Sequence, residues 1–433
     1  GICEYTGGIF PGKYAQASFV CEPVSNLVHA DYLAANPPTF KAERIELEKE
    51  FLASTDSWFR PVNLTVGPDG AMYVVDFYRK LVEHPDWLAM ADSSGFYTHA
   101  GKIKESDFLE GNNRGRIYRI VPKDFKKSGR VQPFMSQVDV QTLVGYLREP
   151  NKWWRINAQR LLVDRKSKEA VPLLTELLSA GNAPETKIHA LWTLEGLDAL
   201  TDDILLQAFD DENPMVRKQA VLLAEKRISN PIFVDRIIQA TSDADGYVQF
   251  QAALTLSSIA KDRPKVYDAL KSIISSHISN KWFQSAVLLG AAENANQWFE
   301  AFRDFRSATD SGDAGKKEFV NKIAAITGAR YQQTELSSLI NMIDQLKDTG
   351  VIVASLKGMS EGMRRNSSTI SLSAMGQKGL LDLMVNAPAV VRKAAIGAAS
   401  QLKLLPSAEL THILNRAKEV ASDQQQSVEE RVL

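Results

Sequence analysis

The chain has 433 residues, of which 44% are hydrophobic and 24% are charged, close to the averages for folded proteins, so disorder or a collagen-like structure is not expected. Lys and Arg total 51 and Asp and Glu total 52, so the sequence lacks the basic excess that holds proteins on phosphate backbones, and nucleic acid is not expected as a partner. No apolar run approaches the roughly 18 residues that a membrane-spanning helix needs.

The first segment holds both cysteines of the chain, Cys3 and Cys21, on either side of a Gly- and Pro-rich stretch. Because such a stretch is able to turn the chain back, we predict a disulfide that joins neighbouring strands and an oxidising compartment. Two unrelated reduced thiols are the alternative. The sequence contains no Cys-x-x-Cys-His motif, which excludes a c-type haem site within this chain.

Residues 1–125 carry the alternating pattern of short strands bounded by turn residues. The clearest unit is a hairpin in which the strand 62–66 leads through Gly67-Pro68-Asp69-Gly70 into the strand 71–76. Asp69 is predicted to be a turn residue, because Asp-Gly readily supplies the positive φ of a tight turn. Regularly spaced antiparallel hairpins indicate a sandwich, a barrel or propeller blades. Further strands are expected at 18–21, 26–29, 40–47 and 115–121.

Residues 54–79 (STDSWFRPVNLTVGPDGAMYVVDFYR) and 111–122 (GNNRGRIYRIVP) resemble a bacterial family of putative membrane-bound dehydrogenases, related to glucose and sorbosone quinoprotein dehydrogenases. The resemblance implies a six-bladed β-propeller followed by HEAT repeats, in some members with a c-type cytochrome domain. Residues 1–125 hold strands for roughly two blades, so we expect an internal fragment of a longer protein, or a second chain that completes the ring. The expected fold is thus the closing blades of a β-propeller followed by an all-α HEAT solenoid.

The resemblance places Arg60 where related quinoproteins contact pyrroloquinoline quinone, since a guanidinium grips a carboxylate at two points. The alternative is a surface ion pair of Arg60 with Glu50 or Asp56. Asp76 and Arg79 either line the same pocket or pair with each other. The expected cofactor is pyrroloquinoline quinone with calcium. The full set of predicted cofactor-binding residues is Arg60, Asp76, Arg79, Glu22 and Arg114.

His84 follows the strand 71–76 in the sequence Glu83-His84-Pro85. A histidine in a loop at a strand end suits a general base or a ligand, and a structural histidine bonded to a nearby loop is the alternative. The catalytic histidine of the family belongs to an earlier blade, so no catalytic residue is assigned. The sequence contains no phosphate-binding loop, nucleophile elbow or clustered metal ligands.

From residue 137 onward, apolar residues recur at helical spacing in units of helix, short polar turn and helix. Asn213 and Pro214 show the start of a second helix, as an N-cap side chain followed by proline. The recurring Val-Arg-x-x-Ala pattern resembles HEAT repeats, and His189 is assigned to the position that Arg155 and Arg217 occupy in other units. Helix pairs are expected at 140–147 with 151–162, 170–178 with 185–192, 204–209 with 213–223, 233–240 with 245–254, and 266–274 with 281–286.

Residues 306–316 are expected to form a loop, whereas 319–326 and 336–346 still have helical spacing. The tail 427–433 is expected to start a helix whose remainder is missing. The predicted domains are blades at 1–125, a linker at 126–136, HEAT repeats at 137–292, degenerate helical repeats at 293–380, and HEAT repeats with a truncated last copy at 381–433.

Two functions follow from these features. In the first, the chain is part of an exported, periplasmic or cell-surface quinoprotein dehydrogenase that oxidises a sugar or alcohol, and its solenoid docks an electron acceptor such as a c-type cytochrome. In the second, the chain is a non-catalytic scaffold or binding protein, because solenoids present long binding surfaces and a fold does not imply an activity.

Overall fold

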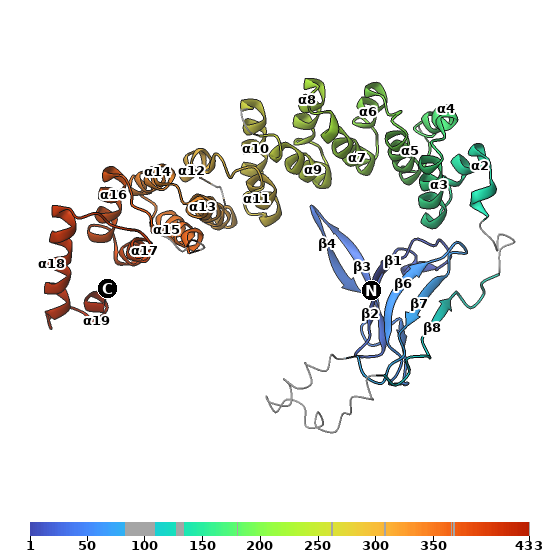
Figure 1. Cartoon of the computed structure of the whole chain (residues 1–433), viewed down its shortest axis with the longest axis horizontal. Coiled ribbons are helices and arrows are strands. Elements are labelled where there is room, and N and C mark those ends of the chain that lie inside the picture. Colours follow the sequence, from blue (N-terminus) through green and yellow to red (C-terminus); the bar gives the residue numbers. More distant parts are fainter. Residues whose placement is uncertain are drawn as a thin grey trace. The chain divides into compact units, whose positions relative to one another are not determined.

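The computed structural model describes residues 1–82, 109–126, 134–179, 181–260, 263–306, 309–364, 366 and 369–432. Its contacts divide the chain into two compact units, Gly1–Ala220 and Val221–Leu433. The first unit contains β-sheets and the first helix pairs, and the second is built from helices (Figure 1). The predicted domain limits differ from this division and stay predictions.

Two antiparallel sheets form the start of the first unit. One contains β1 (Ile2–Glu4), β2 (Ser18–Glu22), β3 (Leu27–Asn36) and β4 (Thr39–Arg44) in sequence order, with β5 (Leu52–Ala53) paired to β3; the other contains β6 (Pro61–Val66), β7 (Met72–Asp76) and β8 (Arg116–Ile120). The predicted strands are all present, although β3 runs on to Asn36 and β4 ends at Arg44. β1 and β5 were not predicted, because strands of three and two residues are too short to show an alternating pattern. The described residues form no closed propeller.

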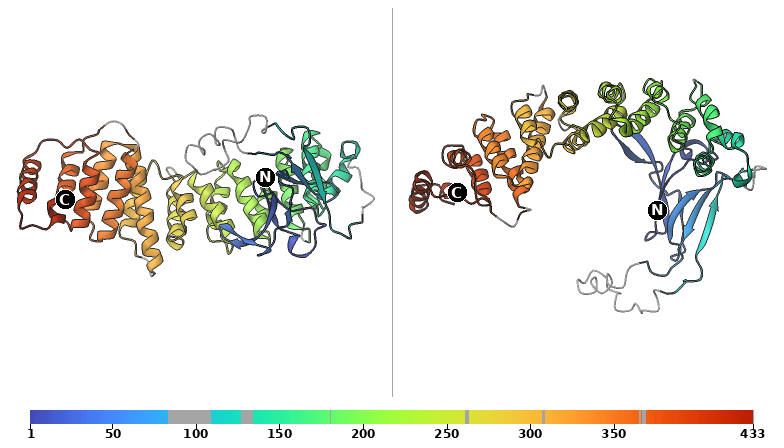
Figure 2. Two further views of the ribbon diagram at one scale, coloured as in Figure 1. Left: turned by 90° about the horizontal axis from the view of Figure 1, so that it is seen from below. Right: turned by 45° about the horizontal axis from the view of Figure 1, so that its top comes forward.

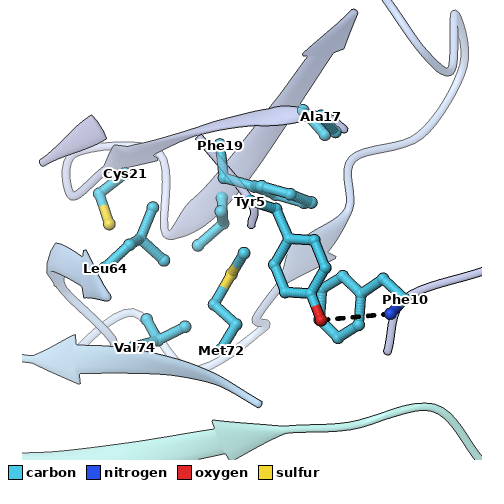
Figure 3. Packing of buried hydrophobic residues seen from close by; sticks show 10 residues of the cluster. Tyr5, Phe10, Ala17, Phe19, Cys21, Leu64, Met72 and Val74 are labelled. Atoms are coloured by element: carbon cyan, nitrogen blue, oxygen red, sulfur yellow. Dashed lines mark hydrogen bonds between the residues drawn. The ribbon is translucent and has the colours of Figure 1, made fainter. Parts of the chain in front are cut away.

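The two sheets pack face to face around one apolar core (Figure 3). Phe19 and Cys21 from β2 meet Leu64 from β6 and Met72 from β7, and all four are buried. Each fully buried side chain of this size contributes about 2 kcal/mol to the stability of the fold. The core therefore depends on both sheets, and neither buries its apolar face alone.

The cysteines Cys3 and Cys21 are free thiols, so the predicted disulfide is not formed. The pairing of β1 with β2 places Phe19 opposite Cys3, which leaves Cys21 as a diagonal neighbour two residues along. Diagonal Cα atoms lie about 7–8 Å apart, beyond the usual disulfide range of about 4.4–6.8 Å. Burial raises the pKa of both thiols, which keeps them protonated and unreactive.

The turn between β6 and β7 is the predicted tight turn, closed by a hydrogen bond of 2.9 Å from Gly67 N to Ala71 O. Asp69 Oδ1 accepts from Ala71 N at 3.1 Å, and Asp69 Oδ2 lies 2.7 Å from Arg119 Nε, which lowers the pKa of the carboxyl group against the opposing effect of its partial burial. Gly70 has φ +78°, and a Cβ there would lie 2.6 Å from Gly7 O. The turn role of Asp69 is confirmed.

All five predicted helix pairs are present and pack in sequence order within each unit (Figure 2). Asn213 Oδ1 accepts from Met215 N at 2.8 Å, which confirms the predicted N-cap. None of the described helices is long and apolar enough to cross a membrane. The pairs are α2 (Val140–Tyr146) with α3 (Lys152–Asp164), α4 (Val171–Glu176) with α5 (Pro184–Gly196), α6 (Asp202–Ala208) with α7 (Pro214–Ala224), α8 (Pro231–Ala240) with α9 (Gly246–Ser257), and α10 (Pro264–Ser276) with α11 (Lys281–Leu288).

The fourth residue after the N-cap of a second helix repeatedly bonds the turn before that helix. Arg155 Nη1 donates to Glu149 O at 2.6 Å and to Pro150 O at 2.7 Å. In α5 this position belongs to Lys187, not to His189 as predicted, because the cap there is Ala183. The equivalent residues Arg217, Gln249 and Gln284 donate to the carbonyls of Asp211, Asp243 and Ile278 at 2.9, 2.6 and 2.7 Å.

His189 lies two residues further along α5, with Nδ1 2.6 Å from Gln159 Oε1 on α3. Burial, together with the charges of Arg155 and Lys152, lowers its pKa to about 4. The unfolded value is about 6.5, so the folded chain binds fewer protons between these values. We therefore expect stability to fall as the pH drops from about 6.5 towards 4, because protonation favours the unfolded state.

The variant His189→Gln tests this assignment. It is expected to lose less stability than the native chain between pH 7 and pH 4.5, since it has no imidazole to protonate. Urea unfolding at the two pH values measures the difference, in which the carboxyl groups common to both proteins cancel. Parallel pH profiles of the two proteins would contradict the assignment.

The predicted loop at 306–316 is wrong over most of its length, because a long helix, α13 (Asp310–Arg330), starts there. Thr309 accepts from Gly312 N at 3.1 Å as its N-cap. The Gly- and Ser-rich sequence suggested a loop, but Gly315 serves close packing, since a Cβ there would lie 2.4 Å from Ile278 O. The predicted helices at 319–326 and 336–346 are confirmed by α13 and α14 (Gln333–Asp344).

The second unit ends in further helices, among them a short helix at the predicted place in the tail. Arg392 on α17 (Ala389–Ala399) pairs with Glu430 on α19 (Val428–Val432). The remaining helices are α12 (Ala295–Arg303), α15 (Thr349–Met363), α16 (Ala374–Val385), α17 (Ala389–Ala399), α18 (Ala408–Ser422) and α19 (Val428–Val432).

Candidate functional site

The second sheet brings three of the predicted cofactor residues together at one end. Arg60 directly precedes β6, and Asp76 is the last residue of β7. Asp76 Oδ1 accepts from Arg60 N at 2.8 Å and from Tyr78 N at 2.9 Å. Arg79 N donates to Trp58 O at 3.1 Å, which fixes the chain after β7 beside the chain before β6.

Arg60 is only 9% exposed, and its guanidinium donates to backbone carbonyls alone. These carbonyls belong to two segments, the turn between β2 and β3 and the chain after β7. Neither of the predicted roles, a grip on a quinone carboxylate or an ion pair with Glu50 or Asp56, matches these bonds. The acceptors are Arg79 O at 3.1 Å, Pro23 O at 2.9 Å, Val24 O at 3.2 Å and Lys80 O at 2.9 Å.

Asp76 does not pair with Arg79 in the described structure. Its buried Oδ2 has no hydrogen-bond donor among the described residues, and Arg116 Nε lies 3.9 Å away. The Arg116 guanidinium lies 3.8 Å from the centroid of the Tyr78 ring, and that of Arg79 lies 4.3 Å from the Phe77 ring. The aromatic rings therefore hold both cations beside this end of the sheet.

The other predicted site residues do not join this group. Glu22 Oε1 accepts from Val24 N at 2.8 Å within its own turn. Arg114 is exposed, and its backbone N donates to Gly111 O at 2.9 Å. His84 lies outside the described residues, so its role stays a prediction.

These residues do not fit the predicted grip on pyrroloquinoline quinone and calcium. The donors of Arg60 are engaged by carbonyls, and Glu22 completes a turn. The part of the chain that the structure describes contains no group of three or more His, Cys, Asp or Glu side chains able to hold a metal ion. Among the described residues at this end of the sheet, Asp76 Oδ2, which has no hydrogen-bond donor and a long contact of 3.9 Å to Arg116 Nε, still suggests a ligand.

The sequence analysis missed a cluster on the first sheet, in which His29 contacts two carboxylates. His29 Nε2 lies 2.8 Å from Asp31 Oδ1, and His29 Nδ1 lies 2.7 Å from Glu50 Oε2. The other oxygen of Glu50, Oε1, pairs with Arg44. Burial opposes the charge on His29, but the bonds to Glu50 and Asp31 raise its pKa. Both ring nitrogens are occupied, so the cluster stabilises the sheet and offers no free base. The signal was His29-Ala30-Asp31, which places both side chains on one face of β3.

A cavity of about 920 Å³ lies in the second unit, between the start of α10 and the turn before α12. Its lining carries both signs of charge, from Arg263, Asp268 and Glu293. Tyr267 donates to Gln297 O at 3.3 Å, and burial together with nearby carboxylates raises its pKa to about 12. The phenol therefore stays neutral near pH 7 and is a poor general base.

Comparisons with known proteins bear on the two parts of the chain separately. Residues 1–124 match the family model of a domain of unknown function, DUF7133. Residues 201–280 match the model of HEAT repeats. No curated protein sequence gives a significant match.

One solved structure similar to the chain is an archaeal HEAT-like repeat protein from Thermococcus onnurineus NA1. It is 16% identical in sequence, with a TM-score of 0.23, and the match covers 68% of this chain and 94% of that one. The match to the repeat model and the paired helices show that the C-terminal part of the chain carries HEAT-like repeats.

Proposed function

We propose that the chain is a protein-interaction scaffold, in which HEAT-like repeats bind a partner protein and the N-terminal sheets form a module fixed to the first repeat. The observation that carries this proposal is the helical repeat itself, matched by the HEAT model over residues 201–280. Stacked helix pairs build extended surfaces that bind other proteins, and this use needs no catalytic group.

The junction between the sheets and the first repeat supports a fixed module. Asn151, the N-cap of α3, donates from Nδ2 to Gly67 O at 2.9 Å, and Trp154 Nε1 donates to Pro68 O at 2.8 Å. Lys152 N donates to Thr6 O at 3.2 Å. Three hydrogen-bond donors at the start of α3 thus bind both the β6–β7 turn and the loop after β1. The sheets and the first repeat therefore belong to one unit.

The proposal treats the two sheets as consecutive blades of a propeller that further chain completes. Their face-to-face packing in chain order supports this view, as do the exposed side chains Ile2 and Ile117, which are 71% and 67% exposed. Export to the periplasm or cell surface is part of the same proposal and now rests on the family resemblance, because the disulfide is not formed.

Cross-linking of the full-length tagged protein in its native source tests the scaffold function. We expect a protein that copurifies in a fixed ratio, with cross-links to the helices of the repeat region, and that an excess of untagged chain displaces. A chain that elutes alone, with no cross-link beyond those within itself, would refute the scaffold function.

The second candidate function is the quinoprotein dehydrogenase, which Asp76 Oδ2 favours because it has no hydrogen-bond donor among the described residues. In that case a sugar or alcohol is the substrate and a c-type cytochrome is the partner. Titration of the full chain with pyrroloquinoline quinone and calcium, followed by dye reduction, separates the candidates. The scaffold proposal predicts neither saturable binding nor reduction, and saturable binding that Asp76→Asn abolishes would support the dehydrogenase.

A further inference from the structure

The segment between β4 and β5, residues 45–51, contains no strand or helix. β4 and β5 pair with different parts of β3, so this segment runs beside β3 from one pairing to the other. Ile45 N donates to Ala30 O at 3.2 Å, and Phe51 packs edge to face on the buried Phe19, with 4.6 Å between the ring centroids. We call residues 45–51 the strap.

Glu50 joins the strap to β3 through the side chain of His29. Glu50 Oε2 lies 2.7 Å from His29 Nδ1, and Asp31 Oδ1 lies 2.8 Å from His29 Nε2. A neutral imidazole carries one N–H and an imidazolium carries two, so both contacts are hydrogen bonds only when His29 is charged. Without its proton, one ring nitrogen turns a lone pair towards a carboxylate, and that contact becomes repulsive.

The charges of this cluster balance only while His29 is charged. Asp31 and Glu50 supply two negative charges. Arg44 supplies a positive charge, since it pairs with Glu50 Oε1 and stands opposite Asp31 in the register of β3 with β4. Loss of the proton from His29 leaves two carboxylates against one cation. Asp31 belongs to the same strand as His29, whereas Glu50 belongs to the strap, so the strap contact can be lost with no change in the sheet.

The surroundings of His29 set the pH at which this contact is lost. Burial lowers the pKa of His29, but the bonds to Glu50 and Asp31 outweigh burial and raise the pKa above its ordinary value of about 6.5. A base with a raised pKa stabilises the closed arrangement fully below about pH 6.5, and this contribution is lost as the pH rises through the raised pKa. The bond to His29 lowers the pKa of Glu50, which therefore stays ionised in this range.

We propose that the strap is a pH-sensitive conformational switch, held on β3 while His29 is charged and loosened when His29 becomes neutral in alkaline medium. Loosening separates Phe51 from Phe19 and from Phe10, whose ring centroid lies 5.9 Å away. Apolar surface of the N-terminal sheets thus becomes accessible at the higher pH. The inference goes beyond the scaffold function, because it concerns the N-terminal sheets and needs no partner.

Hydrogen–deuterium exchange of the full-length protein at about pH 6 and about pH 8.5 tests the switch, after correction for the faster chemical exchange at the higher pH. Peptides within residues 45–53 report on it, because Ile45 N and the residues of β5 bond to β3. Their protection should fall by about threefold or more at the higher pH, since a shift of one pKa unit is worth tenfold. Protection of β6 and β7 should stay unchanged.

His29→Gln removes the titrating group and keeps a hydrogen-bond donor. Its strap should exchange alike at both pH values, at the level that the native chain shows at the higher pH. Lys13→Met is the matched control, because it breaks another contact of the strap, in which Lys13 pairs with Glu46. That bond raises the pKa of Lys13, so the pair does not titrate between the two pH values. Lys13→Met should lower protection equally at both values and keep the native pH dependence.

Equal protection of residues 45–53 at both pH values in the native protein would overturn the inference, and this result needs no variant. A pH dependence that persists in His29→Gln, or one that disappears in Lys13→Met, would overturn it as well. Circular dichroism confirms that both variants are folded. The scaffold function has a separate readout in the cross-linking experiment, so either idea can fail without the other.

Discussion

Replacing Gly358 by alanine is expected to destabilise the second unit by about 3 kcal/mol. The helices α13 and α15 approach so closely that a Cβ at Gly358 would lie 2.0 Å from Asn321 O. A Cβ at Gly362 would likewise lie 2.1 Å from Ala325 O. The backbone oxygen cannot rotate aside as a side chain does, so the two helices must separate and lose contacts along their length.

The matched control is Gly397→Ala on α17, where a Cβ would meet nothing within 4 Å. That replacement should stabilise the chain by up to about 1 kcal/mol, because alanine has the higher helix propensity. Thermal unfolding followed by circular dichroism, with urea unfolding for the free energies, compares the two variants. A Gly358→Ala protein as stable as the control would show that α13 and α15 do not pack this closely.

Replacing Arg60 by methionine is expected to destabilise the two sheets by about 4 kcal/mol, since four carbonyls lose their donor at about 1 kcal/mol each. The stability of Arg60→Lys should lie between those of the native chain and Arg60→Met, because one ammonium group reaches fewer of these acceptors than a guanidinium does. Hydrogen–deuterium exchange of β6 and β7 measures the loss where it occurs.

The control for Arg60→Met is Arg114→Met, since Arg114 was predicted for the same pocket but is exposed. Its replacement should change stability by less than about 0.5 kcal/mol. A cofactor role for Arg60 gives the opposite pattern, in which the unliganded Arg60→Met protein keeps its stability and loses quinone binding. Unchanged exchange of β6 and β7 in Arg60→Met would therefore refute its structural role.

The difference between the two interpretations of Arg60 shows where sequence reasoning stopped. The motif around Arg60 and Pro61 indicates a strand start, but the partners of the guanidinium lie in segments up to 37 residues away in the chain. Similarly, Cys3 and Cys21 looked like a disulfide pair, and only the strand register showed Phe19 opposite Cys3. A shift of two residues in register would reverse that conclusion.

The helical part was predicted better because its signals are local. Helical spacing and caps such as Asn213 depend on neighbours within a few residues, so the five helix pairs followed from the chain alone. Errors arose where packing between distant helices set the residue type. The glycine at Gly315 was taken as a loop signal, although it permits contact with the chain at Ile278.

By itself the sequence determined the antiparallel strands, the turn at Asp69 and the paired helices of a HEAT-like solenoid, since these depend on periodicity and turn chemistry. Tertiary structure alone decided that Arg60 binds carbonyls, that the cysteines stay reduced, and that Gly315 permits a close approach to Ile278. Those outcomes depend on which distant segments meet, and a local pattern carries no information about that.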